Sequence, residues 1–348
     1  MRTSLLGIGL TLGIAAAIAT SSGCGGDDSN GNNGEGTDGG SDSGGGGGTD
    51  SGGGTDSGGD AGPKIGGNAI LTSLSTTVNI GGTPTPVRVL RPVVGFSAIG
   101  AVHHQYSDGQ TFGCSADHFD VGQNLGSDSN AGNIKITKYS SANFLNGQKA
   151  PEEINCAIVT NSGLSLYQCG YGPLESGKPG QVSINTPYPG SADLVKNNQV
   201  IHVEIAGGSD VGAIDTAADL VAVGSPQVTE DLATIKYDPA KDMTLHLTCP
   251  GDACGYVTAV NVVANQNTPD TFDQPSPTSG AITCTFLDSS QPIVVKKEAI
   301  AAMFGSDAAI KSVQTSVVSF GLPIAKSDAN GNSISFVAGG GVLGVAPR

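Results

Sequence analysis

Three side chains of the types that bind metal ions lie near one another in the sequence, namely His104, Asp117 and His118. Two imidazoles and a carboxylate would leave a metal ion open to a water molecule, which is the arrangement of a metal-dependent hydrolase. The set forms only if the loop that carries Asp117 folds back on the preceding segment. The simpler interpretation is solvated histidines on strand faces and loops, since the neighbouring His103 and His104 point to opposite faces of a regular strand.

Other catalytic and ligand-binding motifs are either absent from the sequence or better interpreted as turns and surface pairs. It contains no nucleophile elbow of the form G-x-S-x-G, and no glycine-rich phosphate loop that follows a strand and opens a helix. Asp328, Asn330 and Asn332 have calcium-like spacing, but the Asn-Gly pair between them is a strong hairpin signal and predicts a turn. His202 and Glu204 lie two residues apart, which predicts an exposed pair on one strand face. We therefore assign no catalytic residue and no cofactor.

Six cysteines follow Cys24, an even number that predicts disulfides in an exported protein. The turn signal Ser162-Gly163 separates two apolar runs, and a hairpin closed by these two residues places Cys156 directly opposite Cys169. The other four cysteines allow three pairings, which stay open at this point: Cys114, Cys249, Cys254 and Cys284. Zinc binding is the alternative, and the absence of any C-x-x-C spacing argues against it.

The N-terminal segment predicts lipid attachment at Cys24. Residues 5–19 form an apolar run with the length of a signal-peptide core, shorter than a membrane-spanning helix requires. Residues 21–23 (SSG) supply the small side chains that lipoprotein cleavage requires, with serine where leucine is usual. We expect residues 1–23 to be a lipoprotein signal peptide, and Cys24 to be the first, lipidated residue of the mature chain.

Residues 24–62 are expected to form a disordered tether that begins at the lipid. The segment after Cys24 is rich in Gly, Ser and Asp and contains no basic or large apolar side chain, so it cannot bury enough surface to fold. A flexible coil of this length has a root-mean-square reach of about 30–35 Å. Glycine rather than aspartate follows Cys24, which favours sorting to the outer membrane.

The charge of the chain argues against nucleic acid as a partner. The full sequence carries a formal net charge of −15. Removal of the signal peptide leaves −16, of which the tether carries −8 and residues 63–348 carry −8. The acidity of the body is spread along the sequence and leaves no basic patch to contact phosphates.

The body of the protein is predicted to be all-β. Apolar and polar residues alternate with a period of two in several short stretches, including 201–205, 243–249 and 282–286. Gly, Pro, Asn and Asp separate these stretches, which is typical of antiparallel strands with one buried face. The one helix that we expect with any length covers 297–304 (KEAIAAMF).

The length of the body suits two domains. A composition change near Gly224-Ser225-Pro226, directly after the apolar stretch LVAV, suggests the boundary. We therefore expect two antiparallel Ig-like β-sandwiches, at residues 63–223 and 224–348, with disulfide bonds holding strands together.

Several phrases of the body occur in a recurring order: DSNAGNIKIT (128–137), VIHVEIAGGSDVGAIDTAADLVAV (200–223), DMTLHLTC (242–249), GAITCTFLDSS (280–290) and IVVKKEAIAAMF (293–304). In this order the chain resembles a group of surface lipoproteins from large-genome, social Gram-negative bacteria. Members combine a lipobox, a low-complexity tether and a β-rich body, and the group has no established activity. This chain departs from the group at 246–248, where tryptophan is common, and at Ile214, where phenylalanine is common.

Taken together, the sequence predicts a non-enzymatic lipoprotein of the outer membrane, periplasmic or surface-exposed. Its lipid would hold it to the membrane, and its body would present a binding, adhesion or structural surface to a protein or glycan ligand. The first alternative is the metal-dependent hydrolase built on His104, Asp117 and His118. The second is an accessory subunit of a larger envelope complex.

Overall fold

The computed structural model describes residues 65–80, 83–98, 104–110, 112–118, 129–137, 153–161, 164–171, 182–183, 188–189, 197–215, 220–249, 255–266, 278–287, 292–306 and 309–348. Several sequence predictions lie outside these residues: the signal peptide, the lipid site at Cys24 with its tether, the orientation of His103, the turn residues Ser162-Gly163, and any pairing of Cys254. Within them the fold is all-β with one short helix, as predicted.

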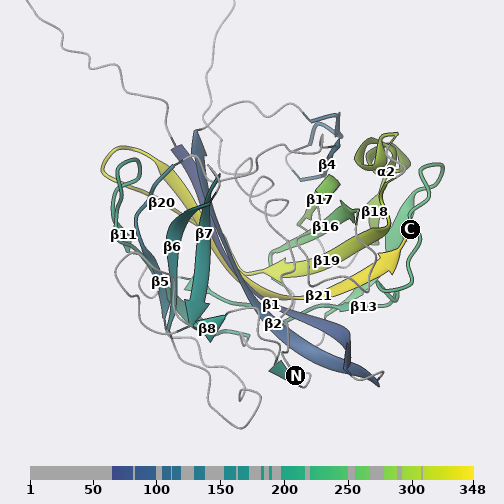
Figure 1. Ribbon diagram of the computed structural model, residues 1–348, viewed down its shortest axis with the longest axis horizontal. Helices are drawn as coiled ribbons and strands as arrows, with labels where there is room; N and C mark the ends of the chain where they lie inside the picture. The colour runs from purple at the N-terminus through teal and green to yellow at the C-terminus, as the bar shows by residue number, and fades with distance from the viewer. Residues whose placement is uncertain are drawn as a thin grey trace, which may run out of the picture.

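A large ten-stranded sheet forms the centre of the structure (Figure 1). Its strands run in the order β3 (Tyr106–Ser107), β4 (Cys114–His118), β17 (Thr278–Phe286), β16 (Val257–Asn265), β19 (Ser312–Phe320), β21 (Ser333–Pro347), β1 (Ile65–Ile80), β2 (Thr83–Ala98) and β9 (Tyr188–Pro189), and β20 (Ile324–Ser327) pairs with β21. All of these pairs are antiparallel except β1 and β21, which run parallel from Gly66 opposite Ser333 to Ser75 opposite Val342.

A seven-stranded antiparallel sheet and two small ladders complete the strands. The seven-stranded sheet has the order β11 (Ile214–Asp215), β10 (Val200–Ile205), β5 (Ile134–Thr137), β6 (Ile154–Asn161), β7 (Leu164–Tyr171) and β8 (Val182–Ser183), and β12 (Leu220–Val221) also pairs with β10. The ladders join β13 (Gln227–Val228) to β15 (Leu247–Thr248), and β14 (Met243–Leu245) to β18 (Ile293–Val295).

Two larger apolar cores form between these layers, and a third, smaller buried cluster is made by strands of the large sheet alone. In the first, Leu71 and Phe336 of the large sheet belong to one buried cluster with Ile134 and Val203 of the seven-stranded sheet. Side chains of β5 and β10 alternate between buried and half-exposed, so only one face of that sheet enters the core. This is the one-sided burial that the alternation of residues 201–205 predicts.

The second core lies at the other end of the large sheet, where β14, β18 and the helix α2 (Lys297–Phe304) pack over β16, β17 and β19. The helix covers the residues predicted for it. Its buried side chains, Ala299, Ile300, Met303 and Phe304, recur at the three- and four-residue spacing of one helix face. It ends at Gly305, whose φ of 52° is a conformation that glycine adopts without strain.

The boundary expected at 223/224 does not separate the strands of the large sheet. β4 lies before that boundary and pairs with β17 after it, while β1 pairs with β21 at the opposite end of the chain. The seven-stranded sheet packs against one part of the large sheet, and β14, β18 and α2 pack against another part. The structure therefore contains two packed units that share the large sheet (Figure 1).

Candidate functional site

The residues singled out for metal chemistry lie at one edge of the large sheet, on and beside β4. This strand pairs with β17 from Cys114 opposite Cys284 to His118 opposite Gly280, and β3 pairs along its other side. Cys114 and Cys284 form a disulfide with their Cα atoms 4.0 Å apart, and both side chains are buried. The bond selects one of the pairings that the sequence leaves open.

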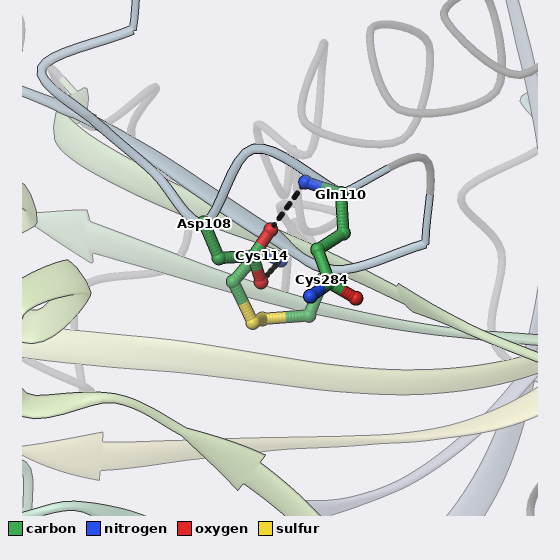
Figure 2. Close-up of a disulfide and its surroundings, with 4 residues drawn as sticks. All are labelled: Asp108, Gln110, Cys114 and Cys284. Carbon is green, nitrogen blue, oxygen red and sulfur yellow. Dashed lines mark hydrogen bonds between the residues drawn. A yellow bond between two sulfur atoms is a disulfide. The ribbon is translucent and has the colours of Figure 1, made fainter.

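The loop that leads into β4 is closed by the carboxylate of Asp108 (Figure 2). Oδ2 of Asp108 accepts a hydrogen bond of 2.6 Å from the backbone N–H of Cys114, and Oδ1 accepts one of 3.2 Å from that of Gln110. The N–H of Asp108 in turn donates to the Cys114 carbonyl at 3.1 Å. An aspartate that bonds its own following backbone is a common way to close a turn, so this carboxylate has a structural role.

His104 and Asp117 come together as a hydrogen-bonded pair. Nδ1 of His104 lies 2.7 Å from Oδ2 of Asp117, and the N–H of Gln105 donates to Oδ1 at 3.1 Å. A carboxylate accepts, so Nδ1 of His104 donates in this pair, and the bond fixes the orientation of the ring.

His118 does not join this pair. Consecutive strand residues point to opposite faces, so the side chain of His118 leaves Asp117 and turns toward the end of α2. There Nδ1 donates to the backbone carbonyl of Met303 at 3.1 Å. The backbone of His118 is bonded by the side-chain amide of Gln105, which donates to its carbonyl and accepts from its N–H, each at 3.2 Å.

The three-ligand metal site considered in the sequence is therefore not assembled. Among the residues that the structure describes, no three His, Cys, Asp or Glu side chains are arranged to hold a metal ion. Covalent catalysis would need a nucleophile beside the imidazole of His104. The one cysteine of β4, Cys114, is bonded to Cys284. What the geometry supports is an oriented histidine and a well-bonded sheet edge.

The disulfide predicted within the hairpin is present. Cys156 of β6 and Cys169 of β7 are direct partners in the predicted register, with Cα atoms 3.9 Å apart. Cys249 is disulfide-bonded as well. The turn signal in the sequence was sufficient to predict the Cys156–Cys169 bond, because the length of a short loop fixes the register of the two strands that it joins.

The predicted pair of His202 and Glu204 belongs to a wider charged row on the outer face of the seven-stranded sheet. Nε2 of His202 lies 2.8 Å from Glu204, and Nδ1 lies 3.4 Å from Asp215 on the neighbouring strand. Lys135 contacts Glu204 at 3.9 Å and Glu153 at 3.7 Å. These two contacts join partly exposed side chains, so we expect each to contribute little to stability.

The segment with calcium-like spacing is a turn, as predicted, and its carboxylate is fully used by protein donors. Asp328 accepts hydrogen bonds from the backbone of Gly212, Asn330 and Asn332, and from the side chain of Asn332. The Asn332 side chain also accepts from the N–H of Ile65, where β1 begins. Burial alone would raise the pKa of Asp328, but these hydrogen bonds outweigh it and hold the pKa below its usual range.

Two polar groupings were not predicted. Glu230 accepts hydrogen bonds from the ring and backbone of His246, at 2.6 and 2.8 Å. Asn261, Gln314 and Ser316 are buried polar residues on one face of the large sheet. The sequence gives little indication that these three residues are buried, because a polar residue in an alternating strand usually marks the solvent face.

Comparison with protein-family models, with curated proteins and with solved structures finds no match to this chain. The described part of the chain contains no helix long and apolar enough to cross a membrane. Its class is thus defined by its own features: an all-β protein with disulfide bonds between paired strands.

Proposed function

We propose that this protein is anchored to the cell envelope by a lipid on Cys24, and that its β-sheet body presents a binding, adhesion or structural surface. The observation that carries the proposal is the pair of disulfides between paired strands, Cys114–Cys284 and Cys156–Cys169. Disulfides of this kind form and persist outside the reducing cytosol. They support export, which the signal pattern before Cys24 also indicates.

The way in which the first strand of the body is held agrees with attachment through a tether before it. β1 is the first described element, and its first residue is held by the hydrogen bond from Ile65 to Asn332. β1 is then paired along both sides, to β2 and to β21. A pull applied through the preceding segment would therefore act on an interior strand of the large sheet, which suits a body held at its N-terminal end.

The anchor is tested by acyl labelling of Cys24→Ser in the native host. We expect loss of the label and release of the protein from membranes, while Cys249 and the other cysteines are left unchanged. A Ser22→Ala variant is the matched control, because it keeps a small side chain before the cleavage point and should retain both label and membrane association. Membrane retention of an unlabelled Cys24→Ser protein would contradict the proposal.

The face of the membrane on which the body lies is tested separately, with protease added to intact cells. Cleavage of the body in intact cells would place it on the surface, where it could meet an external protein or glycan. Protection that is lost on permeabilisation would place it in the periplasm and favour a structural role. If the body resists protease even in permeabilised cells, the disulfides are reduced before protease is added. Reduction should make the folded body cleavable, so that its location can then be determined.

A further inference from the structure

Three buried polar side chains on β16 and β19 lack hydrogen-bond partners. Asn261, Gln314 and Ser316 are 1%, 2% and 0% exposed, so their polar atoms have little contact with solvent. Within the described part of the chain, no partner is found for either polar atom of the Asn261 amide, for Nε2 of Gln314 or for Oγ of Ser316. Buried polar groups are normally bonded to protein or to ordered water, so these atoms require an explanation.

The strand register brings the three side chains to one place. Asn261 lies directly opposite Ser316, and Gln314 lies opposite Val263, two residues further along the same face. Directly opposite side chains in an antiparallel pair are neighbours, and diagonal ones are within reach of a long side chain such as glutamine. The unpaired atoms therefore form one cluster.

Apolar side chains surround the cluster on this face of the sheet. Val263, Val318 and Leu343 belong to a buried apolar group, and the register places them on the same sheet face as Asn261. No charged side chain takes part in the cluster. An amide and a hydroxyl offer both donors and acceptors without net charge, which suits a neutral partner that can also do both.

The opposite face of the same two strands shows that the chain can satisfy buried polar groups directly. Thr258 and Ser319 are cross-strand partners there, and their hydroxyl groups hydrogen-bond to each other at 3.3 Å. The hydroxyl of Thr315 on that face is bonded by Tyr237. On these two strands, the unpartnered side-chain atoms thus lie on the face that carries the cluster.

We propose that Asn261, Gln314 and Ser316 form an internal binding site for water on this face of the large sheet. Water donates and accepts hydrogen bonds, and a buried molecule typically makes about three of them, so one or two molecules would satisfy the four unpaired atoms. The water would lie against this face, over the paired strands β16 and β19, and would give the three polar side chains hydrogen-bond partners inside an otherwise apolar layer.

The experiment is a water-to-amide nuclear Overhauser measurement on the intact, disulfide-bonded protein with labelled Asn and Gln side chains. We expect cross-peaks from long-lived water to the side-chain amide protons of Asn261 and Gln314. Ser316→Ala, which removes one ligand with little change of shape, should weaken them several-fold. Ser319→Ala is the matched control on the opposite face and should leave them unchanged.

A high-resolution crystal structure decides the case independently of the spectra. Density within 2.7–3.2 Å of the Asn261 amide and the Ser316 hydroxyl, of the size of water, would support the proposal. Direct hydrogen bonds among Asn261, Gln314 and Ser316 with no density between them would overturn it. Density too large for water would also overturn it, and would make the site one for an organic ligand. If Ser316→Ala fails to fold, the crystal and the wild-type spectra still decide.

Discussion

Cys114 of β4 and Cys284 of β17 are direct cross-strand partners whose Cα atoms lie 4.0 Å apart, and they join positions 170 residues apart in the chain. Cys156 and Cys169 have the same local geometry but a separation of only 13 residues. The two disulfides therefore differ in the length of the chain segment that they close into a loop, and not in their position between paired strands.

The long-range disulfide should stabilise the fold more than the hairpin disulfide. In the chain-entropy description, closing these loops restricts the unfolded state by about 5 kcal/mol for Cys114–Cys284 and about 3 kcal/mol for Cys156–Cys169. We expect the double alanine variant of the first pair to lose more free energy of unfolding in urea than that of the second. Equal losses would show that native-state packing, and not loop closure, sets the difference.

Asp328 should make the fold sensitive to acid. Its folded pKa is lowered, so its contribution to stability is fully present above the unfolded value of about 4 and is lost as the pH falls through the folded pKa. Asp328→Asn removes a carboxylate that accepts four hydrogen bonds and should cost about 2–3 kcal/mol at pH 7.

The same variant should flatten the stability profile below about pH 4, which urea titrations at several pH values would measure. Asp231→Asn is the matched control, since Asp231 is exposed and its carboxylate accepts one turn hydrogen bond, from Ala233, that an asparagine oxygen can still accept. An unchanged acid slope in Asp328→Asn would contradict the assignment.

Gly280 should not tolerate a side chain. A Cβ atom there would lie 2.0 Å from the carbonyl oxygen of Met303 and 2.9 Å from that of Asp117, both of which belong to the backbone. Gly280→Ala should therefore push α2 away from β17 and cost roughly 1–3 kcal/mol, measured by thermal or urea unfolding. Gly95→Ala is the control, because a Cβ at Gly95 would meet nothing within 4 Å.

His118 should act as a cap for the end of α2. Its Nδ1–H donates to the Met303 carbonyl, one of the last helix carbonyls, and the last turn contains no basic residue of its own. We expect His118→Ala to destabilise the protein by about 1 kcal/mol, whereas His246→Ala, which removes an exposed ring bonded to Glu230, should cost less. Hydrogen exchange at the Gly305 amide would locate the effect, since that amide donates to Ala301 within the same turn.

Local features of the fold were predictable from the sequence because they depend on neighbouring residues. The hairpin of β6 and β7, the helix at 297–304 and the turn after Asp328 each follow from a turn signal or a short periodic pattern. The limits of such patterns are visible at 243–249. That stretch alternates as one strand would, yet its two ends pair with different partners, β14 with β18 and β15 with β13.

The arrangement of the large sheet was not predictable in the same way. The pairing of β1 with β21 and of β4 with β17 joins segments that no local pattern links, and this is why the boundary at 223/224 fails to separate the strands. β17 also buries Thr283 and Thr285 along with Ile282 and Cys284, so its polar positions could not be recognised as interior from alternation alone. His118 was separated from Asp117 by the same strand geometry that placed Asp117 beside His104.

The parallel pairing of β1 with β21 has a consequence for the order in which the protein can be made. β1 is synthesised well before β21, yet the two strands are adjacent over ten residue pairs in the middle of the sheet. One edge of β1 must therefore stay unpaired until β21 has been released from the ribosome. We expect this chain to depend on factors that protect unpaired strand edges during its synthesis, and truncation at residue 332 to leave β1 open to intermolecular pairing.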